Sequence, residues 1–175
     1  MDWSRAKSIL IIALIICNLV LGSFYMSGIK EERAEIEQMT ENAISYMESK
    51  GIDIVCEVPL EIDTIPVITL KLKEGNSAGG LARTEYDGIP LEVVGLRSSD
   101  YIESLQKTDS VIEVLPAYTA LLKSIESVEG EVDDIELIYL VDRAEYAGEA
   151  GQDTALPYWK ISSQGNSYYY AAFAE

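Results

Sequence analysis

Histidine is absent from the 175-residue chain, and cysteine occurs only twice, at Cys17 and Cys56. The absence of histidine removes the most common general base and a common zinc ligand. Cys17 lies inside an apolar run and Cys56 outside it, so no disulfide framework is expected. A nucleophile–base pair would have to use serine, threonine or Cys56 without histidine. The sequence therefore predicts a protein that is not an enzyme and that holds no metal and no cofactor.

Basic residues are also scarce. The chain has 13 Lys and Arg against 30 Asp and Glu, which gives a formal net charge of −17. Asp2, Arg5 and Lys7 are the only charged residues before position 30, so residues 30–175 carry 29 acidic and 11 basic residues. Nucleic acid and anionic lipid surfaces are poor partners for such a chain. We expect no nucleic-acid binding.

Only one long apolar run is present. Residues 8–29 form a stretch of 22 residues without a charge, and about 20 apolar residues suffice for a helix to cross a bilayer. Arg5 and Lys7 precede the run and predict that its N-terminal side is cytoplasmic. We expect a cytoplasmic segment over 1–7, a single transmembrane helix over 8–29 and an extracytoplasmic remainder.

A cleaved signal peptide is the alternative for this run. Such a peptide has a shorter apolar core, of roughly 7–15 residues, followed by a small-x-small cleavage site. Val20-Leu21-Gly22 fits that site poorly, and the apolar run continues beyond it. An uncleaved anchor in the cell membrane is the better interpretation.

One face of the predicted span carries polar and small residues. Leu14, Asn18, Gly22 and Tyr25 follow one another at three or four positions and so share a helix face. An amide near the membrane centre favours a partner helix, and glycine permits close approach of a neighbouring backbone. The four residues are candidates for a transmembrane interface. The alternative is an inert anchor that tolerates one asparagine.

The remainder is predicted to form a helix followed by three or four strands, and then a second helix followed by three strands. Residues 30–50 predict a helix with one apolar stripe (Ile36, Met39, Ala43, Met47), which ends at Gly51. Strands are expected over 67–73 and 135–142, and hairpin turns at Asp87-Gly88 and at 164–167.

A second helix is expected from Ser110, where Glu113 completes a capping box. Pro116 falls inside this run, so the helix either bends there or begins there. The pattern predicts an α+β protein with two small units, each a helix plus an antiparallel sheet, over 30–97 and 98–175.

Aromatic residues gather near the C-terminus. Tyr158, Trp159 and Tyr169 lie in the last predicted hairpin with Tyr168, Tyr170 and Phe173. They are candidates for an extracytoplasmic ligand contact. More often, aromatic residues in a terminal hairpin form cross-strand pairs and core.

Both ends of the chain resemble the YycI family. The opening MDWSRAK runs directly into the apolar span with Asn18 inside it, and LPYWKI at 156–161 is followed by YYYAA at 168–172. Residues 111–122 are similar to the helix that precedes the last sheet of that family. The resemblance implies a YycI-like, PepSY-like fold and no catalysis.

YycI proteins are accessory to the WalK/WalR (YycG/YycF) two-component system. The resemblance implies that the partners are a WalK-like sensor histidine kinase and a YycH-like protein. It further implies that kinase activity, which controls cell-wall metabolism, is tuned through transmembrane helix contacts. We therefore expect a membrane-anchored regulator of that kinase.

Two functions from other classes stay open at this stage. One is a structural division or sporulation protein with a membrane-proximal coiled coil, although the stripe from Ile36 to Met47 covers fewer than two heptads. The other is an extracytoplasmic module that binds wall sugars or peptides through the C-terminal aromatic residues.

Overall fold

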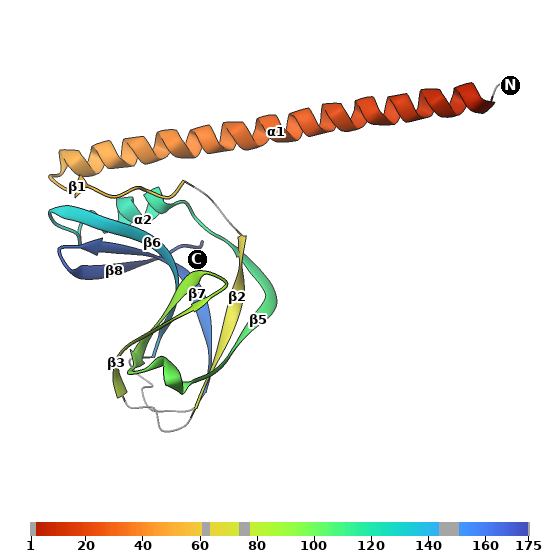
Figure 1. The fold of residues 1–175 in the computed structure, drawn as a ribbon. Coiled ribbons are helices and arrows are strands. Elements are labelled where there is room, and N and C mark those ends of the chain that lie inside the picture. Colours follow the sequence, from red (N-terminus) through yellow and green to blue (C-terminus); the bar gives the residue numbers. More distant parts are fainter. Residues whose placement is uncertain (1–2, 61–63, 74–77, 144–150, 175) are drawn as a thin grey trace. The chain divides into compact units, whose positions relative to one another are not determined.

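The computed structural model describes residues 3–60, 64–73, 78–143 and 151–174. Within these ranges the side chains of 3–6, 8–10, 24–26, 29, 32 and 78 are outside the description. The chain divides into two compact units, residues 1–39 and 40–175, and each is described by itself. One helix, α1 (Trp3–Ser49), supplies the described part of the first unit and enters the second (Figure 1).

The second unit is rich in strands. Besides the end of α1 it contains one short 3-10 helix, η1 (Ser99–Tyr101), and one α-helix, α2 (Ala117–Ser124). Its strands are β1 (Asp53–Ile54), β2 (Thr64–Leu72), β3 (Ala78–Tyr86), β4 (Ile89–Leu96), β5 (Ile102–Glu113), β6 (Glu131–Asp142), β7 (Gln152–Ser163) and β8 (Asn166–Ala171).

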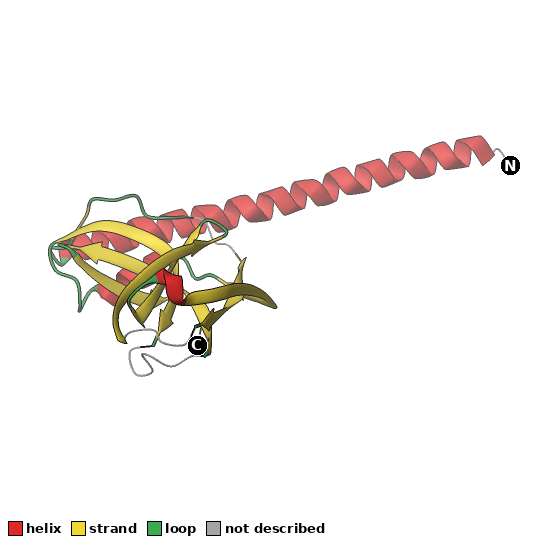
Figure 2. Ribbon diagram, turned by 60° about the horizontal axis from the view of Figure 1, so that its bottom comes forward, coloured by secondary structure: helices red, strands yellow, loops and turns green. Residues whose placement is uncertain are grey.

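All eight strands belong to one curled, mixed sheet (Figure 2). The order is β3-β4-β6-β7-β2-β5, with β1 added beside β6 and β8 beside β7. The pairs β4–β6 and β1–β6 are parallel, and the remaining pairs are antiparallel. The α+β class is confirmed, whereas the expectation of purely antiparallel sheets is wrong.

The strands of the two expected units interleave in this sheet. β4 from the 30–97 stretch pairs with β6, and β2 lies between β7 and β5 from the 98–175 stretch. The structure therefore differs from the expected division, because no boundary near position 98 separates two sheets. Local hairpin signals predict neighbouring strands only, and the long-range pairings decide how the hairpins join.

The predicted end of α1 is confirmed. Gly51 has φ +81°, and its N–H donates to the carbonyl of Glu48 while the N–H of Ile52 donates to the carbonyl of Met47. These two bonds make a Schellman motif, which favours glycine because its φ is positive. Met47 and Ile52 are both buried, so the motif also brings an apolar contact into the core.

Both predicted hairpin turns are present. Asp87 and Gly88 have φ of +53° and +79°, and Gln164 and Gly165 have φ of +49° and +80°. Two consecutive positive values are typical of the type I′ turn, whose twist matches that of the flanking strands. The second turn is shorter than predicted, since Asn166 already belongs to β8.

The expected helix start at Ser110 is wrong. Residues 102–113 form β5, in which Ile112 lies opposite Ile65 of β2. Pro116 is the N-cap of α2, so of the two alternatives at this proline the helix begins there. Within α2, Leu121 is buried while Leu122 is 42% exposed. Strand pairing with β2 outweighs the local capping signal in β5.

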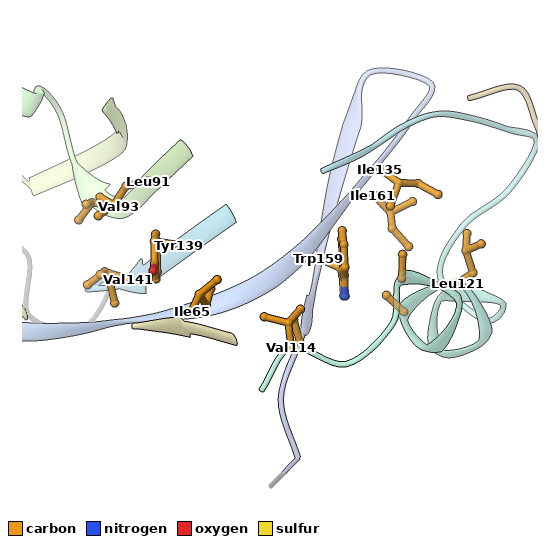
Figure 3. Packing of buried hydrophobic residues seen from close by; sticks show 14 of the residues in the cluster. Ile65, Leu91, Val93, Val114, Leu121, Ile135, Tyr139, Val141, Trp159 and Ile161 are labelled. Atoms are coloured by element: carbon orange, nitrogen blue, oxygen red, sulfur yellow. The ribbon is translucent and has the colours of Figure 1, made fainter. Parts of the chain in front are cut away.

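The core lies between the sheet and the helices of the second unit. Ile135, Trp159 and Ile161 of the sheet lie near Leu121 of α2, while Leu91, Val93, Tyr139 and Val141 lie in the curl of the sheet (Figure 3). Two partly buried hydrogen bonds hold aromatic residues within it. Trp159 Nε1 donates to the carbonyl of Leu115 at 2.7 Å, and Tyr139 Oη donates to the carbonyl of Pro66 at 2.8 Å.

In the described part of the chain, no helix is both long enough and apolar enough to cross a membrane.

Candidate functional site

The predicted transmembrane face lies on α1. Leu14, Asn18 and Gly22 are all in this helix and exposed, and Leu14 is 63% exposed. A Cβ atom added at Gly22 would meet nothing within 4 Å. Tyr25 lies in the same helix, but its side chain is outside the described residues. The three described residues therefore share a face that no other described part of the chain covers.

Exposed aliphatic residues surround α1 on all sides in this region. Between 11 and 21 they are Ile11, Ile12, Leu14, Ile15, Ile16, Leu19, Val20 and Leu21, each between 47% and 68% exposed. Successive helical residues are turned by about 100°, so this set covers most of the circumference. A helix that is apolar all round is typical of one buried by another protein or by lipid.

The predicted aromatic cluster does not form one surface. Trp159 is 2% exposed and lies in the core. Tyr158, its neighbour in β7, faces the opposite side of the sheet, where its ring meets Phe173 edge-on at 6.0 Å between centroids. Tyr169 is half-buried and donates to a carboxylate. The cluster consists of core and cross-strand contacts rather than an open platform.

Sequence reasoning missed a charge cluster on the sheet around the buried carboxylate of Glu92, formed with Arg83, Lys160 and Tyr169. Glu92 of β4 is 2% exposed. One of its oxygens, Oε1, accepts from Lys160 Nζ at 2.7 Å and lies 3.0 Å from Arg83 Nε. The other, Oε2, accepts from Tyr169 Oη at 2.7 Å. Four different strands thus meet at one carboxylate.

This environment shifts two protonation equilibria. Burial by itself would raise the pKa of Glu92, but the hydrogen bonds from Lys160 and Tyr169 and the charges of Lys160 and Arg83 together outweigh it, and the pKa is lowered. Burial, followed by the hydrogen bond to Glu92 and its charge, raises the pKa of Tyr169 to about 12. At neutral pH Glu92 is therefore an ionised carboxylate and Tyr169 a neutral phenol.

Part of the cluster follows from the turns. Arg83 lies directly opposite Glu92 across the Asp87-Gly88 hairpin, and Lys160 lies opposite Tyr169 across the last hairpin. Either pair could have been found by counting outward from its turn. The contact between the two pairs could not, because it depends on β6 lying between β4 and β7.

No protein-family model matches this chain, and neither curated proteins nor solved structures give a significant match.

Proposed function

We propose that this chain is a membrane-anchored accessory regulator of a cell-wall-sensing two-component histidine kinase. In this proposal residues 8–29 span the cell membrane with a cytoplasmic N-terminus, and the acidic β-rich unit lies outside. A WalK-like kinase and a YycH-like protein are the proposed partners. The resemblance of both chain ends to the YycI family supports the choice of partner, and the all-round apolar surface of α1 supports the anchor.

The observation that carries the proposal is the exposed face of Leu14, Asn18 and Gly22. An amide in an apolar helix gains most when a second helix supplies a hydrogen bond, and a glycine four residues away lets that helix come close. A regulator can act through such a face only if it binds one state of the kinase better than another. The proposed contact is therefore selective for one kinase state.

The coiled-coil alternative has less support. Ala43 and Met47, the C-terminal half of its apolar stripe, are 3% and 0% exposed within the second unit. Because Ala43 and Met47 are buried within this unit, the C-terminal half of the stripe is not available to a partner helix. The wall-ligand alternative also loses its central residue, because Trp159 is buried.

The test replaces Asn18 and Gly22 together by leucine in the full chain and measures co-purification of the kinase and expression of its regulon. Ala13→Leu with Cys17→Leu is the matched control, since these residues lie off this face, about 140° and about 100° around the helix axis from Asn18, and also gain bulk. We expect the first pair to weaken association and change regulon expression, and the control to preserve both.

Unchanged association and regulon expression in the Asn18/Gly22 variant would refute the transmembrane contact. An equal loss in both variants would also refute it, because the effect would then follow from bulk rather than from this face. Membrane fractionation of each variant shows that both are inserted to the same extent.

A further inference from the structure

The outer edge of β3 is open for pairing. From Leu81 to Tyr86 this strand pairs regularly with β4, and the only irregularity of the β3–β4 register lies before Leu81. Among described residues, no other backbone group bonds to this stretch. Exposed strand edges with free N–H and C=O groups are templates for a further strand.

The other end of the sheet is blocked by its own geometry. β5 carries a bulge where Pro66 faces Val111 but Ile68 faces Lys107, and a second irregularity near Leu72. Thr108 stabilises the first bulge, because its Oγ1 donates to the carbonyl of Val67 and accepts from the N–H of Ser110. Bulges on edge strands prevent the pairing of another strand. Of the two strands that end the order β3-β4-β6-β7-β2-β5, β5 is therefore irregular and β3 offers a regular edge.

The turn determines which residues of β3 point their backbone groups outward. Tyr86 and Ile89 close the two-residue turn, so the carbonyl of Tyr86 bonds to the N–H of Ile89. Backbone groups alternate in direction along a strand. Tyr86, Thr84 and Ala82 thus face β4, while Glu85, Arg83 and Leu81 present free groups to the outside.

We propose that the occupant of this edge is β3 of a second copy of the chain, paired antiparallel about Thr84. In such a pair, residues whose backbone N–H and C=O groups point outward must lie opposite one another. Three ways of aligning the two strands near their middle satisfy this condition. One places Arg83 opposite Arg83 and another places Glu85 opposite Glu85. The third, centred on Thr84, places Arg83 opposite Glu85 twice. Opposite charges stabilise directly facing cross-strand pairs and like charges destabilise them.

The charge cluster favours the same register. Glu92 is held by Lys160 and Arg83, so the three charged side chains carry a net positive charge in a chain of net charge −17. Arg83 is 62% exposed, so its guanidinium remains accessible beyond Glu92. Glu85 of the second copy would lie beside it and extend the row Lys160, Glu92, Arg83 with an opposite charge.

This pairing is two-fold symmetric, as most homodimer interfaces are. Six residues make a short edge, so association is expected to be weak in dilute solution. Confinement of two anchored copies in one membrane raises their effective concentration. The appropriate test therefore uses the full chain in membranes.

The test is cross-linking by Thr84→Cys in a Cys17→Ser, Cys56→Ala background. Thr84 lies on the two-fold axis at a non-hydrogen-bonded position, where the two Cα atoms approach to about 4.5 Å and a disulfide can form. The matched control is Leu81→Cys, since three residues from the axis the two thiols would be roughly 20 Å apart. Mild oxidation should give a covalent dimer of the first variant only.

Adding Glu85→Lys to Thr84→Cys should lower the dimer yield roughly tenfold, because Arg83 would then face lysine twice. Two results would overturn the proposal: no dimer from Thr84→Cys, or equal dimer from Thr84→Cys and Leu81→Cys. A cross-link from Thr84→Cys to another membrane protein, seen as a heavier band without the homodimer, would assign the edge to a different strand and also overturn it.

Discussion

Replacing Lys160 by methionine should strongly destabilise the second unit, because it leaves the carboxylate of Glu92 buried without its closest cation. Glu92 is 2% exposed and accepts from Lys160 at 2.7 Å. Removing one partner of a buried ion pair costs about 3–5 kcal/mol. The contacts of Glu92 with Arg83, at 3.0 Å, and with Tyr169 remain. We therefore expect Lys160→Met to lower the free energy of unfolding by about 3 kcal/mol, at the lower end of this range.

The pair Lys71 and Glu103 provides a matched control. These side chains also approach closely, at 2.9 Å, but are 59% and 46% exposed. Lys71→Met should therefore cost less than about 1 kcal/mol. The double variant Glu92→Gln with Lys160→Met should recover most of the loss, because no charge is then buried without a partner.

The assay is urea unfolding of the full chain in mild detergent, followed by the fluorescence of Trp159 in a Trp3→Phe background. Because the folded-state pKa of Glu92 is lowered, its contribution is present above the unfolded pKa of about 4.5 and is lost as the pH falls below it. The cost of Lys160→Met should accordingly shrink at acid pH. Equal costs for Lys160→Met and Lys71→Met at pH 7 would refute the assignment of Glu92 as a buried, charge-paired carboxylate.

Three further predictions concern the same unit. Gly130→Ala and Gly165→Ala should each destabilise by about 1 kcal/mol, because both glycines have positive φ. The two losses should be similar, because a Cβ at 130 would meet only the exposed, flexible end of the Gln164 side chain; a much lower urea midpoint for Gly130→Ala would contradict this. Gly51→Ala should cost about 1 kcal/mol at the end of α1, and restoration of the midpoint by Gly51→Asn, which tolerates positive φ, checks the cause. Burial raises the pKa of Tyr139 to about 12. The neutral phenol therefore contributes its full stabilisation to the fold below pH 10, and about 3 kcal/mol of this stabilisation is lost as the pH rises through 12. Thermal unfolding of the wild type and of Tyr139→Phe between pH 9 and 12 measures this loss. If stability falls with pH equally in both proteins, the contribution of Tyr139 is refuted.

The local structure of the second unit was largely predictable, and the reason is visible at particular residues. The Gly51 motif and the two turns each depend on a few neighbouring residues whose positive φ favours glycine or a small polar side chain. The alternation in 135–142 survives as part of β6. These signals are contained within one turn or one strand, so a single sequence carries them completely.

The pairing of distant strands was not predictable from the same signals. β5 contains Ser110 and Glu113 at capping-box spacing, and only its partner β2 shows that this stretch is extended. The cluster at Glu92 required the same kind of information, since its two hairpins meet across β6. In β5 the pairing with β2 outweighs the local capping signal, because packing against cross-strand neighbours largely decides whether a segment is extended.

The interleaved sheet also decides how the proposed functions can be separated by experiment. A cut near position 98 would remove β5, β6 and β7 from β2 and β4, and would expose the core residues of both stretches. Deletion of either stretch would therefore unfold the other, and its phenotype would say nothing about partners. Substitutions at Asn18 and Gly22 alter only the exposed face of α1, and Glu85 only the exposed edge of β3. Because these positions lie in separate units, the proposed kinase association and the proposed self-pairing can be tested independently of each other.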